Sequence, residues 1–289
     1  MYVGRATDLR GGFDLGTAQD VIRALYKRLL LRAPDANGLA QWVAIYEKGS
    51  IDLDSMLSLF LQSEEFKANF PHFTRTYGPG DLGLTNDHSQ GGEFFELLKL
   101  IVSRGAPGKI LVDVGANGKE RSNSYDLLRH FGWKGLLIEA NPALREQILT
   151  DFSGLDFELV SVAISDEDGT GTLSLGINSD VSSLSERNTA NWGPIFGSVP
   201  VAVRRLPPIL EENGIPRDFD LLSLDIEGYD SRVLNDLIEH SHFRPTWVII
   251  EGSHNFTVSD PRRIGVSELV CKEYEVSART RANLILARG

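Results

Sequence analysis

The chain has 289 residues, of which 42% are hydrophobic and 24% charged, so its composition is that of a globular protein and excludes a disordered or fibrous one. Its 40 acidic and 29 basic residues give a net charge of −11, which argues against nucleic acid or anionic lipid as the main partner. The length is sufficient for one sizeable α/β core and a smaller module.

The first 70 residues show helical periodicity only. Apolar residues recur at helical spacing over residues 18–32, and further helices are predicted from Asp35 to Gly49, over about 53–61, and after Ser63. These helices predict a small bundle over residues 1–70. Residues 71–90 are rich in Pro, Gly, Asn and Asp and are predicted to be a linker.

Short apolar strands alternate with helices over residues 91–289. Strands are predicted at 109–114, 135–140, 157–165, 219–226 and 246–252, a hairpin-like stretch at 169–176, and two more strands in the tail 274–288. The alternation predicts a parallel sheet covered on both faces, with ligands at the carboxyl ends of its strands. Residues 176–198 are expected to form a long polar loop.

The cysteine content indicates whether the compartment is reducing or oxidising. Cys271, the single cysteine, cannot form an internal disulfide or a cysteine-based zinc site, and we interpret it as a small core residue. This usage predicts a reducing, cytoplasmic compartment. Apolar runs of about 18 residues are absent, so no membrane span is expected, and the first residues lack an apolar stretch of signal-peptide length.

The turn after the first predicted strand carries the strongest local signal. Asp113 ends this strand, and Gly115, Asn117 and Gly118 follow in a turn that lets the backbone approach a ligand closely. The second strand ends at Glu139, whose carboxylate can accept both hydroxyls of a ribose. Together these features favour a nucleoside-type ligand.

The identity of that nucleoside follows from charge. The glycine patterns of dinucleotide and phosphate-binding loops are absent, and Asp113 would repel a pyrophosphate. The same carboxylate would attract the sulfonium and ammonium groups of S-adenosylmethionine. The turn therefore favours S-adenosylmethionine as the cofactor.

Five segments, 112–117, 137–142, 162–169, 182–184 and 219–229, resemble in this order the motifs of FkbM-family S-adenosylmethionine-dependent methyltransferases. The resemblance implies a Rossmann-like class I methyltransferase fold whose last strand is antiparallel, and O-methylation of a sugar or another natural-product hydroxyl. It also adds Ala140 and Ala163 to the predicted cofactor-binding residues. One departure is Lys119, which stands where the family usually has a glycine.

Methyl transfer to oxygen requires alignment of donor and acceptor and removal of one proton. The predicted catalytic residues lie at or just after strand ends: Asp225 is the favoured base, and Glu251 and His254 are further candidates. Asp225 and Glu251 could instead hold a divalent metal, an alternative that we do not favour.

The expected acceptor is a hydroxylated small molecule or a glycan, because residues 176–198 offer Ser and Asn side chains for hydroxyls and Trp192 for a sugar face. Two alternatives stay open: a methyltransferase acting on a non-sugar natural product, and an inactive methyltransferase fold that serves as a binding module. Lys119 is the main support for the second alternative.

Residues 26–42 and 59–66 of the bundle resemble phycobilisome linker modules. We expect the bundle to act in localisation, protein or oligomer contact, or acceptor delivery, and residues 91–289 to fold and bind the cofactor alone. In the competing hypothesis, Phe66, Phe70 and Phe73 pack on the catalytic domain and complete its core.

Overall fold

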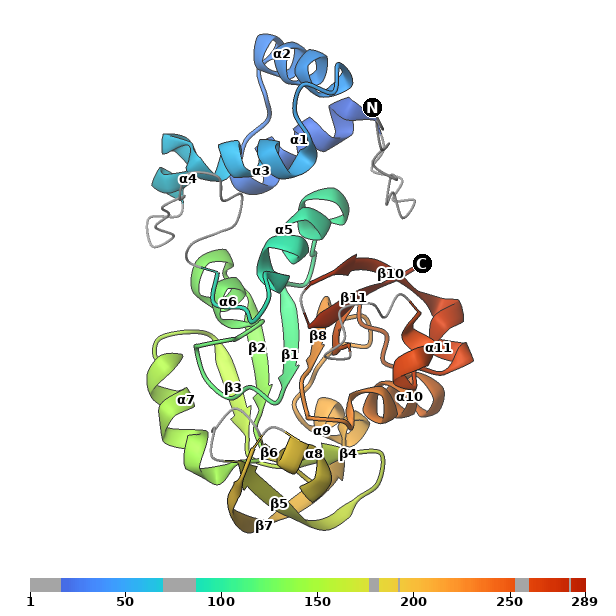
Figure 1. The fold of residues 1–289 in the computed structure, drawn as a ribbon. Coiled ribbons are helices and arrows are strands. Elements are labelled where there is room, and N and C mark those ends of the chain that lie inside the picture. Colours follow the sequence, from blue (N-terminus) through green and yellow to red (C-terminus); the bar gives the residue numbers. More distant parts are fainter. Residues whose placement is uncertain (1–16, 70–86, 177–181, 192, 253–259, 281) are drawn as a thin grey trace, which may run out of the picture.

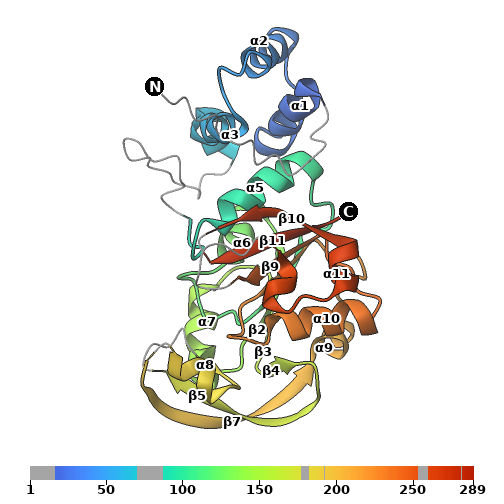
Figure 2. The ribbon, with the colours of Figure 1, turned by 45° about the vertical axis from the view of Figure 1, so that its right-hand side comes forward.

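The computed structural model describes residues 17–69, 87–176, 182–191, 193–252, 260–280 and 282–289. A helical N-terminal part lies at one end of the molecule, next to α5 (Glu93–Arg104), and a small second sheet lies at the other end (Figures 1 and 2). The main sheet lies between them.

The N-terminal bundle consists of α1 (Ala18–Leu29), α2 (Ala36–Glu47), α3 (Leu53–Gln62) and α4 (Glu64–Asn69). Side chains cap the first three helices: Thr17 forms a capping box with Asp20, and Asp35 and Asp52 accept backbone N–H groups. Gly49, with φ +65°, follows α2 in the left-handed conformation that glycine favours. The predicted helical character of this region is confirmed in its described part.

The main sheet has seven strands in the order β10-β11-β9-β8-β1-β2-β3, with β1 near its centre. Neighbouring strands are parallel from β9 to β3, whereas β11 is antiparallel to both of its neighbours. The sheet therefore confirms the predicted mostly parallel arrangement with an antiparallel last strand. Its strands are β1 (Ile110–Val114), β2 (Lys134–Ile138), β3 (Phe157–Val160), β8 (Leu221–Leu224), β9 (Trp247–Glu251), β10 (Tyr274–Arg279) and β11 (Asn283–Arg288).

Two hydrophobic cores lie on opposite faces of this sheet because successive strand side chains alternate between the faces. Leu111 of β1 belongs to the core under α5, α6 and α7, and Val112 belongs to the core under α9, α10 and α11. The helices are α6 (Tyr125–Phe131), α7 (Arg145–Asp151) after η1 (Pro142–Leu144), α9 (Leu206–Glu212), α10 (Asp230–His240), and α11 (Glu268–Glu273) after η2 (Pro261–Ile264). Cys271 of α11 packs beside the second core, as predicted.

The prediction of a single strand over residues 157–165 is wrong in one respect. It divides into β3 of the main sheet and β4 (Ala163–Ser165), which joins a second sheet of order β4-β7-β5-β6. The predicted loop 176–198 is also wrong in part, because β6 (Ser182–Ser183), α8 (Glu186–Asn191) and the start of β7 (Ile195–Arg205) lie within it, after β5 (Gly169–Gly176). Sequence patterns miss these elements because a two-residue strand and a short polar helix carry no hydrophobic period.

The bundle packs on the second part of the chain through α5. The hydrophobic core on that face continues without interruption from α1 and α3 to the sheet. Phe66 of α4 is fully buried, with its ring centroid 6.4 Å from that of Phe131 in α6. Lys99 of α5 forms a 3.1 Å ion pair with Asp54 of α3. These contacts favour the competing hypothesis for Phe66, whereas Phe70 and Phe73 lie outside the described residues.

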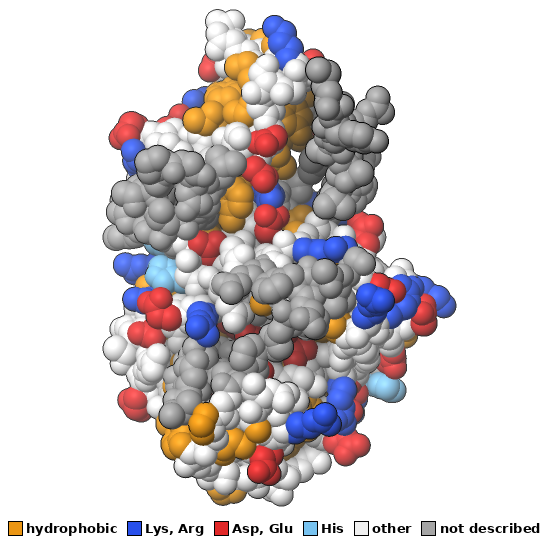
Figure 3. Space-filling view, viewed as in Figure 1, with side chains coloured by type: hydrophobic (Ala, Val, Ile, Leu, Met, Phe, Trp, Pro, Cys, Tyr) orange, Lys and Arg blue, Asp and Glu red, His pale blue; other side chains and the backbone are white. Residues whose placement is uncertain are grey.

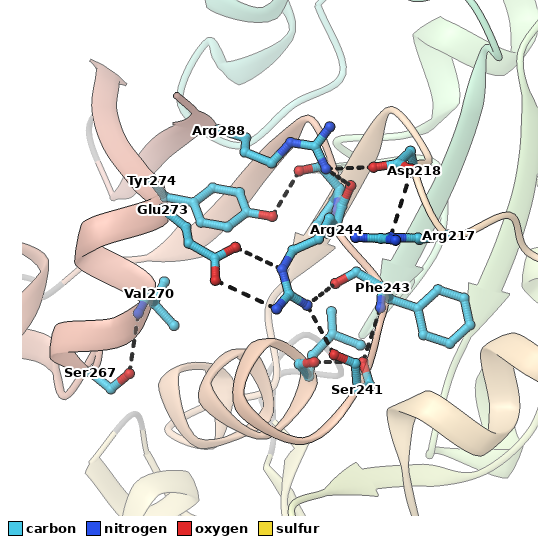
Figure 4. A network of polar contacts seen from close by, with 12 residues as sticks. Arg217, Asp218, Ser241, Phe243, Arg244, Ser267, Val270, Glu273, Tyr274 and Arg288 are labelled. Atoms are coloured by element: carbon cyan, nitrogen blue, oxygen red, sulfur yellow. Dashed lines mark hydrogen bonds and ion pairs between the residues drawn. The ribbon is translucent and has the colours of Figure 1, made fainter.

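A polar network joins the elements at the amino ends of the central strands (Figure 4). Arg244, which precedes β9, contacts Glu273 at 2.7 Å and donates to the carbonyl oxygens of Ser241 and Phe243. Tyr274 donates its hydroxyl to the Pro245 carbonyl at 2.9 Å. This network lies at the edge of the sheet opposite the carboxyl ends of its parallel strands, so we assign it a structural role.

Candidate functional site

The turn after β1 is packed tightly between the ends of β2 and β8. A Cβ atom on Gly115, which has φ +88°, would approach the Asp225 carbonyl oxygen to 1.9 Å. The Gly115 N–H donates to the Ile138 carbonyl at 2.8 Å, and the Asp225 N–H donates to the Val114 carbonyl at 3.0 Å. Position 115 therefore requires glycine for both conformation and space.

Glu139 follows β2 and organises the backbone on both sides of the site. Its Oε2 accepts the Asn117 N–H at 3.1 Å, and its Oε1 accepts the Asn141 N–H at 2.7 Å. Burial raises the pKa of Glu139, and these backbone N–H groups lower it in part. Each carboxylate oxygen can accept a second hydrogen bond, so Glu139 can still receive ligand hydroxyls.

These two features meet in one pocket. Its empty space, which includes open solvent at its mouth, amounts to about 570 Å³. Six predicted site residues line it: Gly115, Asn117, Glu139, Ala140, Ala163 and Asp225. Apolar side chains form much of the remaining wall: Val114, Ile138, Leu144, Val162, Ile164, Leu173, Leu184 and Ile226. The pocket thus combines an apolar surface with several carboxylates.

Two predicted cofactor-binding residues lie outside this lining. Gly118 faces α7, where a Cβ atom would lie 2.8 Å from the Gln147 amide nitrogen. Asp113 is the register partner of Ser223 on β8 and is almost fully buried. Burial raises the pKa of Asp113, and hydrogen bonds from the Ser124 and Ser223 side chains lower it in part. Asp113 therefore anchors a buried polar network beneath the turn.

Asp225 and Glu251 directly follow the register pair Leu224 and Ile250 of β8 and β9. Burial, followed by the negative charges of Asp230 and Glu227, raises the pKa of Asp225 well above its ordinary value. Burial and the charge of Asp225 raise the pKa of Glu251 to about 9. The two predicted catalytic carboxylates are thus electrostatically coupled, whereas the third candidate, His254, lies outside the described residues.

The side chain of Asp230 stabilises the turn from Asp225 to Asp230. Asp230 is buried, and its two carboxylate oxygens accept the N–H groups of Ile226 and Gly228, each at 3.1 Å. Glu227 lines the pocket with a positive φ of +51°. In the described part of the chain, no group of three or more His, Cys, Asp or Glu side chains is placed to hold a metal ion.

Sequence reasoning assigns no role to several lining residues. Ser182, Ser183 and Leu184 come from β6 and its continuation, and Tyr229 comes from the turn before α10. The segment 182–184 is marked in the sequence only by the family resemblance, because two serines and a leucine in a polar stretch carry no chemical signal alone. Trp192, expected to stack on a sugar, lies outside the described residues.

Comparisons with known proteins agree with this geometry. The family model of the methyltransferase FkbM domain matches residues 113–264, which include every described pocket-lining residue. A domain of unknown function, DUF4214, matches residues 14–70, so the predicted similarity of the bundle to phycobilisome linker modules gains no specific support. No curated protein and no solved structure matches the chain. Among the described helices, none has the length and apolar character needed to cross a membrane.

Proposed function

The chain belongs to the FkbM methyltransferase family, and on this basis we propose that it transfers a methyl group from S-adenosylmethionine to a hydroxyl oxygen of its acceptor. The strand order, with its antiparallel β11, supports assignment of the main sheet to the Rossmann-like class I methyltransferase fold. Ligands of such sheets bind beyond the carboxyl ends of the strands, which is where the pocket lies.

The close approach of Gly115 to Asp225, beside the Glu139 carboxylate, is the observation that carries this proposal. Glu139 would accept the ribose hydroxyls, and Ala140, Ala163 and the apolar wall would surround the adenine. Asn117 would hold the turn through its bond to Glu139. When bound, S-adenosylmethionine supplies an activated methyl group.

Asp225 is the proposed proton acceptor. Its half-buried carboxyl lines the pocket and is coupled to Glu251, so the raised pKa of Asp225 makes its ionised form a stronger base than an exposed carboxylate. Glu251 and His254 are the alternative candidates. Coordination of a divalent metal by Asp225 and Glu251 is a separate alternative, which chelation distinguishes from direct proton transfer.

Lys119 does not support the alternative of an inactive fold, because Lys119 is not among the residues that line the pocket. The Lys119 N–H donates to Asp151 of α7 at 3.1 Å, which directs this part of the turn toward α7. The residues that line the pocket include Gly115, Glu139 and Asp225. We therefore favour an active enzyme over a binding module.

We further propose that the acceptor is a carbohydrate or a glycan-linked hydroxyl compound. The test is incubation of the full chain with methyl-labelled S-adenosylmethionine and a panel of cell-envelope glycans, beside non-sugar hydroxyl compounds. The proposal expects label in a glycan, and its loss with Glu139→Ala. Label only in a non-sugar compound would replace the acceptor class, and binding of S-adenosylhomocysteine without any transfer would favour the binding module.

The bundle is proposed to contact a partner protein or a second copy of the chain. Apolar side chains gather on it in Figure 3, and its exposed residues include Leu31, Leu59 and Ile45, which are 63%, 48% and 40% exposed. Apolar surface of this kind is a common feature of interaction sites. Sedimentation of the full chain and of Leu59→Asp would show whether this surface supports self-association.

A further inference from the structure

The β6–α8 segment, defined here as residues 182–191, contacts the turn that bears Asp225. Ser183 donates its hydroxyl to the Glu227 carbonyl oxygen at 3.0 Å, and Asn188 donates its Nδ2 to the same oxygen at 2.7 Å. A Cβ atom on Gly228 would lie 2.1 Å from this Nδ2. Residues about 40 positions apart in the sequence thus form one wall of the pocket.

The backbone at Glu227 needs this support. A non-glycine residue with φ +51° lies in the left-handed region, which its Cβ atom makes unfavourable. Two donors on one carbonyl hold the turn from one side, while Asp230 holds it from the other through Ile226 and Gly228. The result is a fixed wall that presents Asp225 and Glu227 to the pocket.

Ser182 differs from its neighbour Ser183. The Ser182 residue lines the pocket, and its Oγ atom is buried without a hydrogen-bond partner among the described residues. Ser183, by contrast, uses its hydroxyl on the Glu227 carbonyl. A buried hydroxyl without a partner is costly, and a ligand in the pocket would remove that cost.

We propose that the β6–α8 segment completes the nucleoside pocket, with Ser182 as a ligand-binding residue and with Ser183 and Asn188 as positioning residues. A hydroxyl both donates and accepts, so Ser182 suits the nitrogen atoms of adenine or a ribose hydroxyl. Ser183 and Asn188 act through the Glu227 backbone and do not need to touch the ligand. This inference rests on the proposed function, because it assumes a nucleoside cofactor.

The first test uses Ser182→Ala, with Ser58→Ala as a matched control. Ser58 in α3 is 3% exposed, and its buried Oγ also has no partner among the described residues. Calorimetric titration with S-adenosylhomocysteine and thermal denaturation without ligand are compared for both variants. Ser182→Ala should bind about 3- to 10-fold more weakly, and neither unliganded variant should melt at a lower temperature. Ser58→Ala should bind as the wild type does.

Equal affinities of Ser182→Ala and wild type would overturn the role of Ser182. This result is distinct from failure of the proposed function, in which the folded wild-type chain itself does not bind S-adenosylhomocysteine.

The second test is a double-mutant cycle between Asn188→Ala and Glu227→Gly. Glycine tolerates the left-handed conformation, so it removes the need for the Asn188 clamp. Asn188→Ala alone should weaken S-adenosylhomocysteine binding about tenfold, but at most about twofold in the Glu227→Gly background. An equal loss in both backgrounds would show that Asn188 does not act through Glu227. Melting of the unliganded variants verifies that each one folds.

Discussion

Gly115 and Asp225 lie so close together that position 115 has no room for a side chain: a Cβ atom there would lie 1.9 Å from the Asp225 carbonyl oxygen. The contact joins the turn after β1 to the turn after β8, and both turns line the pocket. Gly115→Ala should therefore reduce S-adenosylhomocysteine affinity by more than about tenfold and lower the melting temperature.

Gly154→Ala is the matched control for this variant. Gly154 also has a positive φ, +77°, but a Cβ atom there would meet no atom of the described residues within 4 Å beyond its chain neighbours. Its alanine variant should lose only about 1 kcal/mol of stability and keep the wild-type affinity. If Gly115→Ala behaves like this control, the close contact between the two turns is not required for binding.

Glu139→Ala removes the carboxylate that would receive the ribose hydroxyls and that holds the N–H groups of Asn117 and Asn141. Loss of a charged hydrogen-bond partner is expected to reduce S-adenosylhomocysteine affinity ~10- to 100-fold. Glu139→Gln keeps one acceptor oxygen and should lose less. Wild-type affinity in a folded Glu139→Ala variant would end this assignment.

The half-buried carboxyl of Glu251 should make stability depend on pH. Its pKa is raised from 4.5 to about 9, so the folded state holds the Glu251 proton more tightly than the unfolded state does. The resulting stabilisation is fully present below pH 4.5 and is lost as the pH rises toward 9. At pH 8.5, Glu251→Gln should therefore be more stable than the wild type by on the order of 1–3 kcal/mol. Urea unfolding at pH 6 and pH 8.5 measures this, and parallel pH profiles for the two proteins would contradict it.

Asp225→Asn tests the proposed base. The variant should lower the methyl-transfer rate ~10²- to 10⁴-fold while binding S-adenosylhomocysteine almost as the wild type does. A rate within a few-fold of wild type would transfer the role to Glu251 or His254. Activity that disappears with chelator and returns with Mg²⁺ would favour the metal alternative.

The contact between the bundle and α5 changes the expectation for the isolated fragment 91–289. Removal of the bundle exposes Phe131, which Phe66 otherwise covers, and leaves Lys99 without Asp54. We therefore expect this fragment to melt at a lower temperature than the full chain. In the full chain, Phe66→Ala should cost about 3–5 kcal/mol. Equal melting temperatures for fragment and full chain would instead support independent folding.

Much of the fold can be predicted because its signals are local. The Asp35 cap, Gly49 and the helix predicted within 18–32 follow from short-range rules, and the structure places them close to their predicted positions. The turn at Gly115 and the strand-end acid Glu139 follow from the same kind of pattern.

The features that sequence reasoning misses are long-range. The break between β3 and β4 depends on a second sheet, and the roles of Ser183 and Asn188 depend on a carbonyl oxygen about 40 residues away. Asp113 is buried and hydrogen-bonded to the Ser124 and Ser223 side chains, which lie 11 and 110 residues away in the sequence, and its expected role beside the ligand stays a prediction. None of these relationships produces a periodic pattern of apolar residues in the sequence.

The central claim is that the pocket bounded by Gly115, Glu139 and Asp225 binds S-adenosylmethionine. Calorimetric titration of the folded full chain with S-adenosylhomocysteine tests it most directly, because this ligand needs no acceptor. We predict saturable binding at one site per chain, weakened in Glu139→Ala and unchanged in Gly154→Ala. Absence of binding to the folded wild-type chain would contradict the claim.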